Sequence, residues 1–291
     1  MSWRVVVVTG VAKLDLKMGF LVVRKETTTR VHLSELHTLI VESTAVSLTA
    51  ALLNELTRQK IKVIFCDEAH NPSSELIPMY GSHDSSMKIK MQMGWPEFIR
   101  EIIWTEIVAE KIRKQAELLA CYGCEERAEL LKTYLQELTP GDRSNREAHA
   151  AKVYFDGLFG VDFTRAEECV TNAALNYGYS ILLSAFNREI AASGYLTQLG
   201  LFHDNRFNPF NLACDLMEPY RPLVDQVVRD SEFEFFEHEE KMVLVDILNH
   251  QVQINGSTQR VTNAIRIYCK SVFEAINQQD MSLLQFYSHE L

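Results

Sequence analysis

The sequence predicts an α+β protein, in which a small β-rich N-terminal domain with one packed helix precedes a larger all-α C-terminal domain. Three observations predict this class. Short β-branched or alternating runs fill the first part of the chain, and an apolar stripe at helical spacing begins after residue 95. A polar, turn-rich stretch at 67–94 separates the two. We therefore expect a β-rich domain at 1–78, a linker at 79–94 and a helical domain at 95–291.

The β-rich part contains several runs with the composition of strands. Residues 13–24 alternate in polarity, and Met18 and Gly19 stand where a hairpin would turn. Leucines recur on one face between residues 44 and 59, which predicts a helix packed on the sheet. The other strand candidates are 4–9, 28–33, 39–41 and 61–66.

The second part reads as helical, with Pro96 placed in the first turn of its first helix. An apolar stripe continues from residue 98 to residue 119. The segment 202–214 is an exception, because its asparagines and Pro209 predict a loop, and loops on rigid helices commonly carry chemistry. Later helices are expected at 125–138, 145–156, 166–192, 219–230, 239–249 and 258–277.

Composition limits the possible classes of protein. The 291 residues are 47% apolar and carry a net charge of −10. Residues 1–90 hold 11 basic and 9 acidic side chains, whereas the rest hold 18 and 30. Such acidity argues against indiscriminate nucleic-acid binding but allows a local basic track. With no signal peptide and no apolar run of about 18 residues, we expect a cytoplasmic protein outside the membrane.

The cysteines do not predict a metal site. Cys121 and Cys124 form a lone C-x-x-C, and a structural zinc site would need a second pair of ligands at suitable spacing. Reduced thiols near a helix end are therefore expected.

Glu147 allows two interpretations. Ser144 and Glu147 have the spacing of a capping box, in which the glutamate folds back onto the start of its own helix. On helical spacing, however, Glu147 shares a face with two alanines and Tyr154. A carboxylate beside small residues and near cations suits a metal ion and a phosphate. The neighbouring cations are Arg143, Arg146 and Lys152.

Three residues could share one ion. Glu147, His203 and Glu218 would supply two carboxylates and an imidazole, a set that suits Mg²⁺ or Mn²⁺. Asp215 lies three residues before Glu218, and prolines at 219 and 222 predict either a helix start or a kinked helix there. Each residue also has an ordinary explanation: a hydrogen-bonded loop histidine, a helix N-terminal acid, or a surface pair of Glu218 with Arg221.

Four blocks of sequence resemble a known family, the CRISPR-associated spacer-acquisition integrases (the first of the universal CRISPR-associated proteins), and its type II branch in particular. The resemblance spans essentially the whole chain, and the runs at 13–17, 64–68 and 80–83 look like the type II pattern. The blocks are the N-R-E-x-x-A-A run at 145–155, the N-x-x-L-x-Y-G-Y run at 172–179, the segment leading to His203, and the D-L-x-E-x-Y-R-P run at 215–222.

The resemblance implies a metal-dependent integrase and endonuclease that inserts spacers into a CRISPR array by attack of prespacer 3′-hydroxyls on repeat phosphodiesters. It assigns Glu147, His203 and Glu218 as metal ligands and catalytic residues. Asp215 and Tyr154 are expected to support them. Implied partners are double-stranded DNA, the second universal CRISPR-associated protein and a second copy of this chain, paired through the β-rich domain. The expected DNA-binding residues are Arg143, Arg146, Lys152, Arg206 and Arg221.

Two alternatives remain from the residues. One is a metal nuclease that hydrolyses branched or single-stranded DNA without joining strands. The other is a non-catalytic scaffold that only holds DNA. The products formed from a 3′-hydroxyl duplex and a repeat-bearing plasmid distinguish the three.

Overall fold

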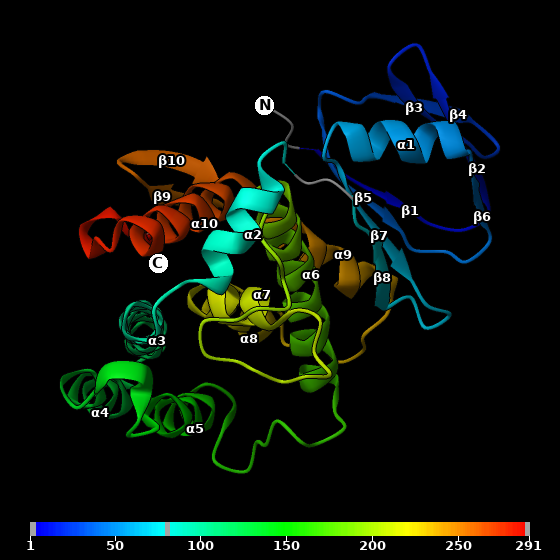
Figure 1. Cartoon of the computed structure of the whole chain (residues 1–291). Coiled ribbons are helices and arrows are strands. Elements are labelled where there is room, and N and C mark those ends of the chain that lie inside the picture. The colour runs from blue at the N-terminus through cyan, green and yellow to red at the C-terminus, as the bar shows by residue number, and fades with distance from the viewer. Residues whose placement is uncertain (1–3, 79–81, 289–291) are drawn as a thin grey trace. The chain divides into compact units, whose positions relative to one another are not determined.

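The computed structural model describes residues 4–78 and 82–288, which form two compact units (Figure 1). The first comprises Met1–Ser85 with Ala191–Tyr195, and the second comprises Ser86–Ile190 with Leu196–Leu291. Part of the expected linker at 79–94 is helical, because α2 spans Ser85–Met93; residues 79–81 lie outside the described part. The α+β class is confirmed.

One sheet of the first unit has the strand order β1-β5-β7-β8. Its first three strands are parallel, whereas the fourth is antiparallel to β7. Every residue of β5 is buried, as expected for a central parallel strand. The strands are β1 (Arg4–Val8), β5 (Leu36–Val41), β7 (Lys62–Cys66) and β8 (Pro72–Leu76). Strand β8 falls in the stretch predicted to be turn-rich.

The other sheet has the order β4-β3-β2-β6. The predicted turn at Met18 and Gly19 joins β2 to β3, and both residues have positive φ, 51° and 79°. The strands are β2 (Ala12–Lys17), β3 (Phe20–Arg24), β4 (Thr28–His32) and β6 (Val46–Leu48).

The helix predicted at 44–59 begins later than expected. Residues Val46–Leu48 pair with β2 as strand β6, so α1 covers only Ala50–Arg58. Thr49 caps it by accepting a hydrogen bond from the N–H of Leu52. Leu52 and Leu56 are buried in the core of this unit, where they join leucines and valines of both sheets.

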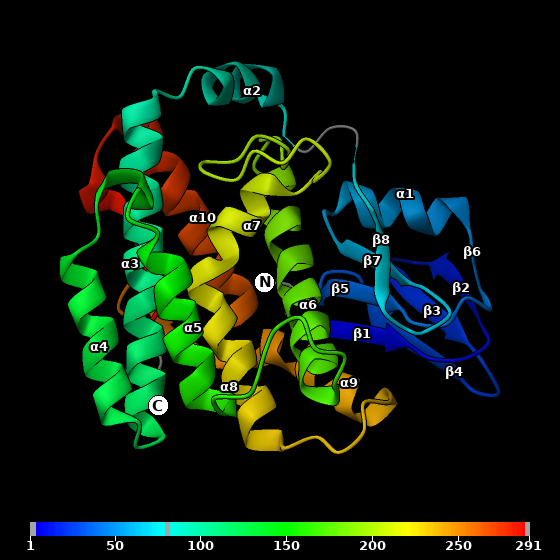
Figure 2. The ribbon, with the colours of Figure 1, turned by 90° about the horizontal axis from the view of Figure 1, so that it is seen from below.

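The second unit is built mainly from helices. Helices α3, α4 and α5 lie side by side and contact one another (Figure 2). Cys121 ends α3 and Cys124 precedes α4, and both are free thiols. No helix in the described ranges has the length and apolarity to cross a bilayer. The helices are α3 (Glu97–Cys121), α4 (Glu125–Gln136), α5 (Arg146–Phe159), α6 (Val170–Ala192), α7 (Asn211–Met217), α8 (Arg221–Ser231), α9 (His238–Asp246) and α10 (Val261–Gln278).

Two local features of this unit differ from simple helix. The chain runs from α7 through a 3₁₀ turn at Glu218–Tyr220 directly into α8, so the kinked alternative for the two prolines is confirmed. A hairpin of β9 (Gln251–Ile254) and β10 (Ser257–Arg260) interrupts the part predicted to be all-α. The hairpin turns at Asn255 and Gly256, both with positive φ, a turn signal that the helical prediction overlooked.

Candidate metal and nucleic-acid site

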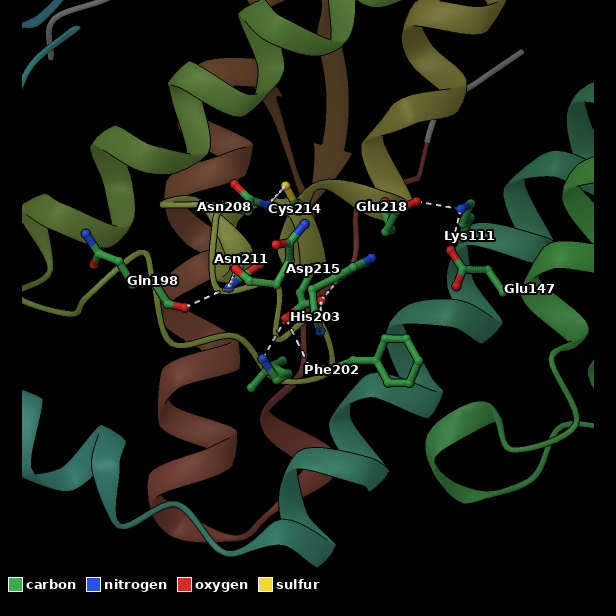
Figure 3. Close-up of polar contacts among 12 residues, drawn as sticks. Lys111, Glu147, Gln198, Phe202, His203, Asn208, Asn211, Cys214, Asp215 and Glu218 are labelled. Carbon is green, nitrogen blue, oxygen red and sulfur yellow. Dashed lines mark hydrogen bonds and ion pairs between the residues drawn. The ribbon is translucent and has the colours of Figure 1, made fainter. Parts of the chain in front are cut away.

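Two of the three predicted ligands meet at one cation. The ammonium of Lys111, on α3, lies 2.6 Å from Glu147 Oε1 and 2.5 Å from Glu218 Oε2. Figure 3 shows Lys111 between the two glutamates, with His203 and Asp215 close by. Lys111 is thereby joined to Glu147, which lies 36 positions later in the sequence, and to Glu218, which lies 107 positions later. The two carboxylates therefore converge on a single point that a positive charge already occupies.

Lys111 is the residue of this cluster that the sequence did not reveal. It stands four positions after Ile107 and three after Val108, on the buried side of α3. Burial alone would lower the pKa of Lys111, but the charges of Glu218 and Glu147 more than offset it and raise the pKa above its ordinary value. A lysine within an apolar helical stripe is the sequence signal that could have indicated this position.

Glu147 is free to act in the cluster because another acid caps its helix. Asp142 accepts hydrogen bonds from the N–H groups of Arg146 (2.8 Å) and Glu147 (3.0 Å). Ser144 instead donates to the carbonyl of Glu137. The capping-box interpretation of Ser144 and Glu147 is therefore wrong. The preceding 3₁₀ turn at Pro140–Asp142 brings Asp142 to the helix start and takes over the capping.

Glu218 is 3% exposed and lies in the 3₁₀ turn between α7 and α8. Its second oxygen accepts a hydrogen bond of 2.9 Å from Arg221 Nε, so each oxygen faces one cation. Burial would raise the pKa of Glu218, yet the charges of Arg221 and Lys111 lower it below its usual value. The carboxylate is therefore held ionised and in a fixed orientation.

Asp215 holds His203 in place. Its buried carboxylate accepts from the N–H groups of Leu201 (2.6 Å), Phe202 (3.1 Å) and His203 (3.1 Å), and from His203 Nδ1 (2.5 Å). Because a carboxylate only accepts, Nδ1 carries the proton and Nε2 is left to bind a metal. The hydrogen bond with Asp215 raises the pKa of His203, with smaller contributions from the charges of Asp215, Glu218 and Glu147.

Gly200 allows this loop to close around Asp215. A Cβ at this position would lie 2.3 Å from the carbonyl oxygen of His203 and 2.7 Å from Asp215 Oδ2. Both distances are too short for a carbon atom, so only glycine fits. The predicted loop at 202–214 is confirmed up to residue 210, after which α7 begins.

The donor groups of the cluster are of the kinds that bind divalent cations. Throughout residues 4–78 and 82–288, no three His, Cys, Asp or Glu side chains lie close enough together to hold a metal. The donor chemistry nevertheless fits: two carboxylates already face one positive charge, and the histidine has the carboxylate partner typical of metal-binding imidazoles. The ammonium of Lys111 occupies the point on which the two carboxylates converge.

Tyr154 contacts a buried acid, Asp225. Its hydroxyl donates to Asp225 Oδ2 at 2.9 Å, and the hydroxyl of Tyr179 donates to Oδ1 of the same carboxylate. Arg221 lies over the ring of Tyr179, with its guanidinium carbon 4.6 Å from the ring centroid. Next to Tyr179, Gly178 has no room for a Cβ, which would lie 2.5 Å from Val224. This network therefore sets the position of Arg221, which in turn fixes Glu218.

The buried Asp225 makes a pH dependence testable. Burial, the largest effect, raises the pKa of Asp225 from 3.8 to about 6. The contribution of Asp225 to the free energy of unfolding should then be largest below pH 4, fall as the pH rises to 6, and stay low above pH 6. The two limits should differ by about 3 kcal/mol. Asp225→Asn keeps partners for both tyrosines and does not titrate. In urea titrations, the variant should gain stability relative to the native protein between pH 4 and 6; a constant difference would contradict this.

The predicted DNA-binding cations differ in how far they are engaged. Arg221 is bound to Glu218, Arg143 pairs with Glu101 at 2.7 Å, and Arg146 pairs with Glu137 at 3.1 Å. Lys152 and Arg206 are exposed. Of these five residues, Arg206 lies on the same loop as His203, with its guanidinium carbon 4.7 Å from the ring centroid of Phe207.

Comparison with protein families gives a match over most of the chain. The family described as CRISPR associated protein Cas1 matches residues 5–232. A CRISPR-associated endonuclease Cas1 of Neisseria meningitidis serogroup C (strain 8013) is 37% identical over 229 residues. That alignment covers 78% of this chain and 75% of the relative.

Solved structures share the fold. A chain of a Cas6-RT-Cas1--Cas2 complex superimposes with a TM-score of 0.76 at 18% identity, over 99% of this chain and 36% of that one. The present chain thus spans about a third of that longer protein. A casposase bound to integration product gives a TM-score of 0.76 at 16% identity, over 97% of this chain and 92% of that one. At these identities the similarity establishes a common architecture.

Proposed function

The chain belongs to the family of CRISPR associated protein Cas1, and we propose that it is a metal-dependent DNA integrase and endonuclease of spacer acquisition. One observation carries the proposal: acids from two separate helical segments converge on one cation, beside a histidine oriented by a buried aspartate. The reaction would be attack of a prespacer 3′-hydroxyl on a phosphodiester of the CRISPR repeat, which forms one P–O bond, breaks another and releases a new 3′-hydroxyl.

The residues have separate roles in this proposal. Glu147, Glu218 and Nε2 of His203 would hold Mg²⁺ or Mn²⁺. A bound divalent cation would polarise the phosphoryl group and lower the pKa of the attacking hydroxyl. Asp215 orients His203, and Arg221 orients Glu218. Once displaced, the ammonium of Lys111 can neutralise phosphate oxygens nearby.

Partners follow from the family and the names of its members. Double-stranded DNA, as prespacer and repeat, is the proposed substrate. The complex that shares this fold contains Cas2, and we propose the second universal CRISPR-associated protein as the partner of this chain. Pairing of two copies through the β-rich domain, 1–78, is proposed with it. The exposed Lys152 and Arg206 are the strongest candidates for phosphate contacts, with Arg143 and Arg146.

A strand-transfer assay tests the function. A prespacer duplex with free 3′-hydroxyls and a supercoiled plasmid bearing the repeat are incubated with protein, partner and Mg²⁺ or Mn²⁺. Joined product is expected, and it should be absent for Glu147→Ala, His203→Ala and Glu218→Ala. Cleavage without joining would identify a hydrolytic nuclease. DNA binding with no covalent change would identify a scaffold.

Removal of the Lys111 charge should strengthen metal binding. Lys111→Met takes away the cation that competes for the two carboxylates, so Mn²⁺ should bind at least about tenfold more tightly, or ~1.4 kcal/mol. The change of ~1.4 kcal/mol is about a third of the ~4 kcal/mol of Coulomb energy between two unit charges 4 Å apart near a protein surface. Calorimetric titration with Mn²⁺ measures it.

Lys114→Met is the matched control for this titration. Lys114 is also buried on α3, but it contacts Glu110 and the carbonyl of Tyr287 and touches neither ligand. The Lys114→Met variant should bind Mn²⁺ with the same affinity as the native protein. If the native protein and Lys111→Met bound Mn²⁺ with equal affinity, Lys111 would not compete with the metal for the two carboxylates.

A further inference from the structure

Phe202 has an unusual setting beside the proposed site. Its ring is stacked on Trp104 with centroids 4.6 Å apart and planes 2° from parallel. Although one face is covered, Phe202 remains 51% exposed. Figure 3 shows its side chain extending from the His203 loop on the side of Lys111 and Glu147. A large apolar side chain is thus left half in solvent one residue before a predicted ligand.

The ring is held in a fixed place. Trp104 is buried in α3, and its ring also contacts His203 edge-on, with centroids 5.7 Å apart. The backbone N–H of Phe202 donates to Asp215, which also anchors His203. Trp104 and Asp215 therefore contact both Phe202 and His203, whose rings also meet edge-on with centroids 5.6 Å apart.

The rest of the loop suits nucleic acid rather than a protein core. Phe207 is 80% exposed, and Arg206 lies over its ring. Flat rings interleaved with an arginine are typical of surfaces that stack the bases of unpaired strands, because every base offers a π-face and every phosphate a charge. An apolar protein partner would not need the arginine, and it would have to approach the site of chemistry.

We propose that Phe202 is a positioning residue for DNA, which stacks the base adjacent to the reacting phosphodiester or 3′-hydroxyl on the face left open by Trp104. This inference rests on the proposed function. A base held there would fix its own phosphate beside Glu147, Glu218 and His203. Since stacking does not read hydrogen bonds, the contact would tolerate any base and would orient the strand rather than select its sequence.

2-Aminopurine fluorescence tests the contact. The probe is placed either at the 3′ terminus of a dideoxy-ended prespacer, which cannot be joined, or next to the cleavage position in the repeat. The native protein should quench the fluorescence of the probe at one of these two positions. The position that is quenched identifies the strand that stacks on Phe202. Phe202→Leu should abolish the quenching and weaken binding of that strand about tenfold. Phe202→Tyr, which keeps an aromatic ring, should retain both the quenching and the affinity.

Phe235→Leu is the matched control, because Phe235 is 68% exposed on a different loop and should leave quenching unchanged. If both Phe202→Leu and Phe202→Tyr lost the quenching and had lower melting temperatures than the native protein, Phe202 would have a packing role and the proposal would be overturned. Normal strand transfer by native protein without quenching in either arm would also overturn it, and would leave the integrase function standing. Absence of both joining and DNA binding would instead refute the proposed function.

Discussion

Glu218→Ala is expected to abolish strand transfer and to destabilise the protein at the same time. Its carboxylate is the shared partner of Lys111 and Arg221, and it is almost completely buried. Removing one member of a buried charge cluster leaves uncompensated charge, which costs about 3–5 kcal/mol. Urea unfolding and the plasmid-joining assay measure the two effects separately.

Glu147→Ala separates chemistry from stability. Glu147 is only partly buried, and its loss leaves Lys111 still paired with Glu218. Joining should therefore disappear, whereas the free energy of unfolding should change by no more than about 1 kcal/mol. If Glu218→Ala proved as stable as Glu147→Ala, the buried cluster would not have the structural role given to it here.

Asp215→Ala is expected to have the largest effect on the loop that carries His203. Four hydrogen bonds to one buried carboxylate would be lost, and three backbone N–H groups would be left without their acceptor. With hydrogen bonds to charged groups at about 1.5–3 kcal/mol each, a loss of at least about 6 kcal/mol is expected. Joining should fall to background, because His203 would lose its orientation.

His203→Ala provides the comparison. It removes one of the four hydrogen bonds and leaves the three backbone contacts to Asp215 intact. The free energy of unfolding should fall by about 1.5–3 kcal/mol, well below the loss in Asp215→Ala, while joining is lost. Hydrogen exchange of the amides at 201–203 should be fast in Asp215→Ala and remain slow in His203→Ala. Slow exchange in both variants would refute the anchoring role of Asp215.

Much of the fold was predictable because local patterns agreed with tertiary packing. Alternation and β-branching predicted β2 and β3 with their turn, and leucine spacing predicted α1. Val46–Leu48 was assigned to that helix because a three-residue strand has too few positions to show its own period. Strand β8 was missed because its proline and two serines satisfy turn statistics equally well. Helix α2 was missed because the glycine and serines at 81–86 were interpreted as part of a linker that continued to residue 94.

The site was predictable only in part, for a related reason. The blocks of sequence indicated Glu147, His203 and Glu218, and the two prolines indicated either a helix start or a kink, without deciding between them. Lys111 and Asp225 lie far away in the chain, and their partners are set by packing of α3 and α8. Asp142 was missed because a capping acid outside the expected spacing depends on the shape of the turn before the helix.

The bridge that Lys111 makes has a practical consequence. In many small metalloproteins the ligands repel one another when the ion is stripped away, and the polypeptide unravels. Here an amino group of the chain itself balances the two acids. Treatment with a chelator should therefore yield an inactive but intact protein, which can be purified and stored in that form and switched on later by adding back the ion.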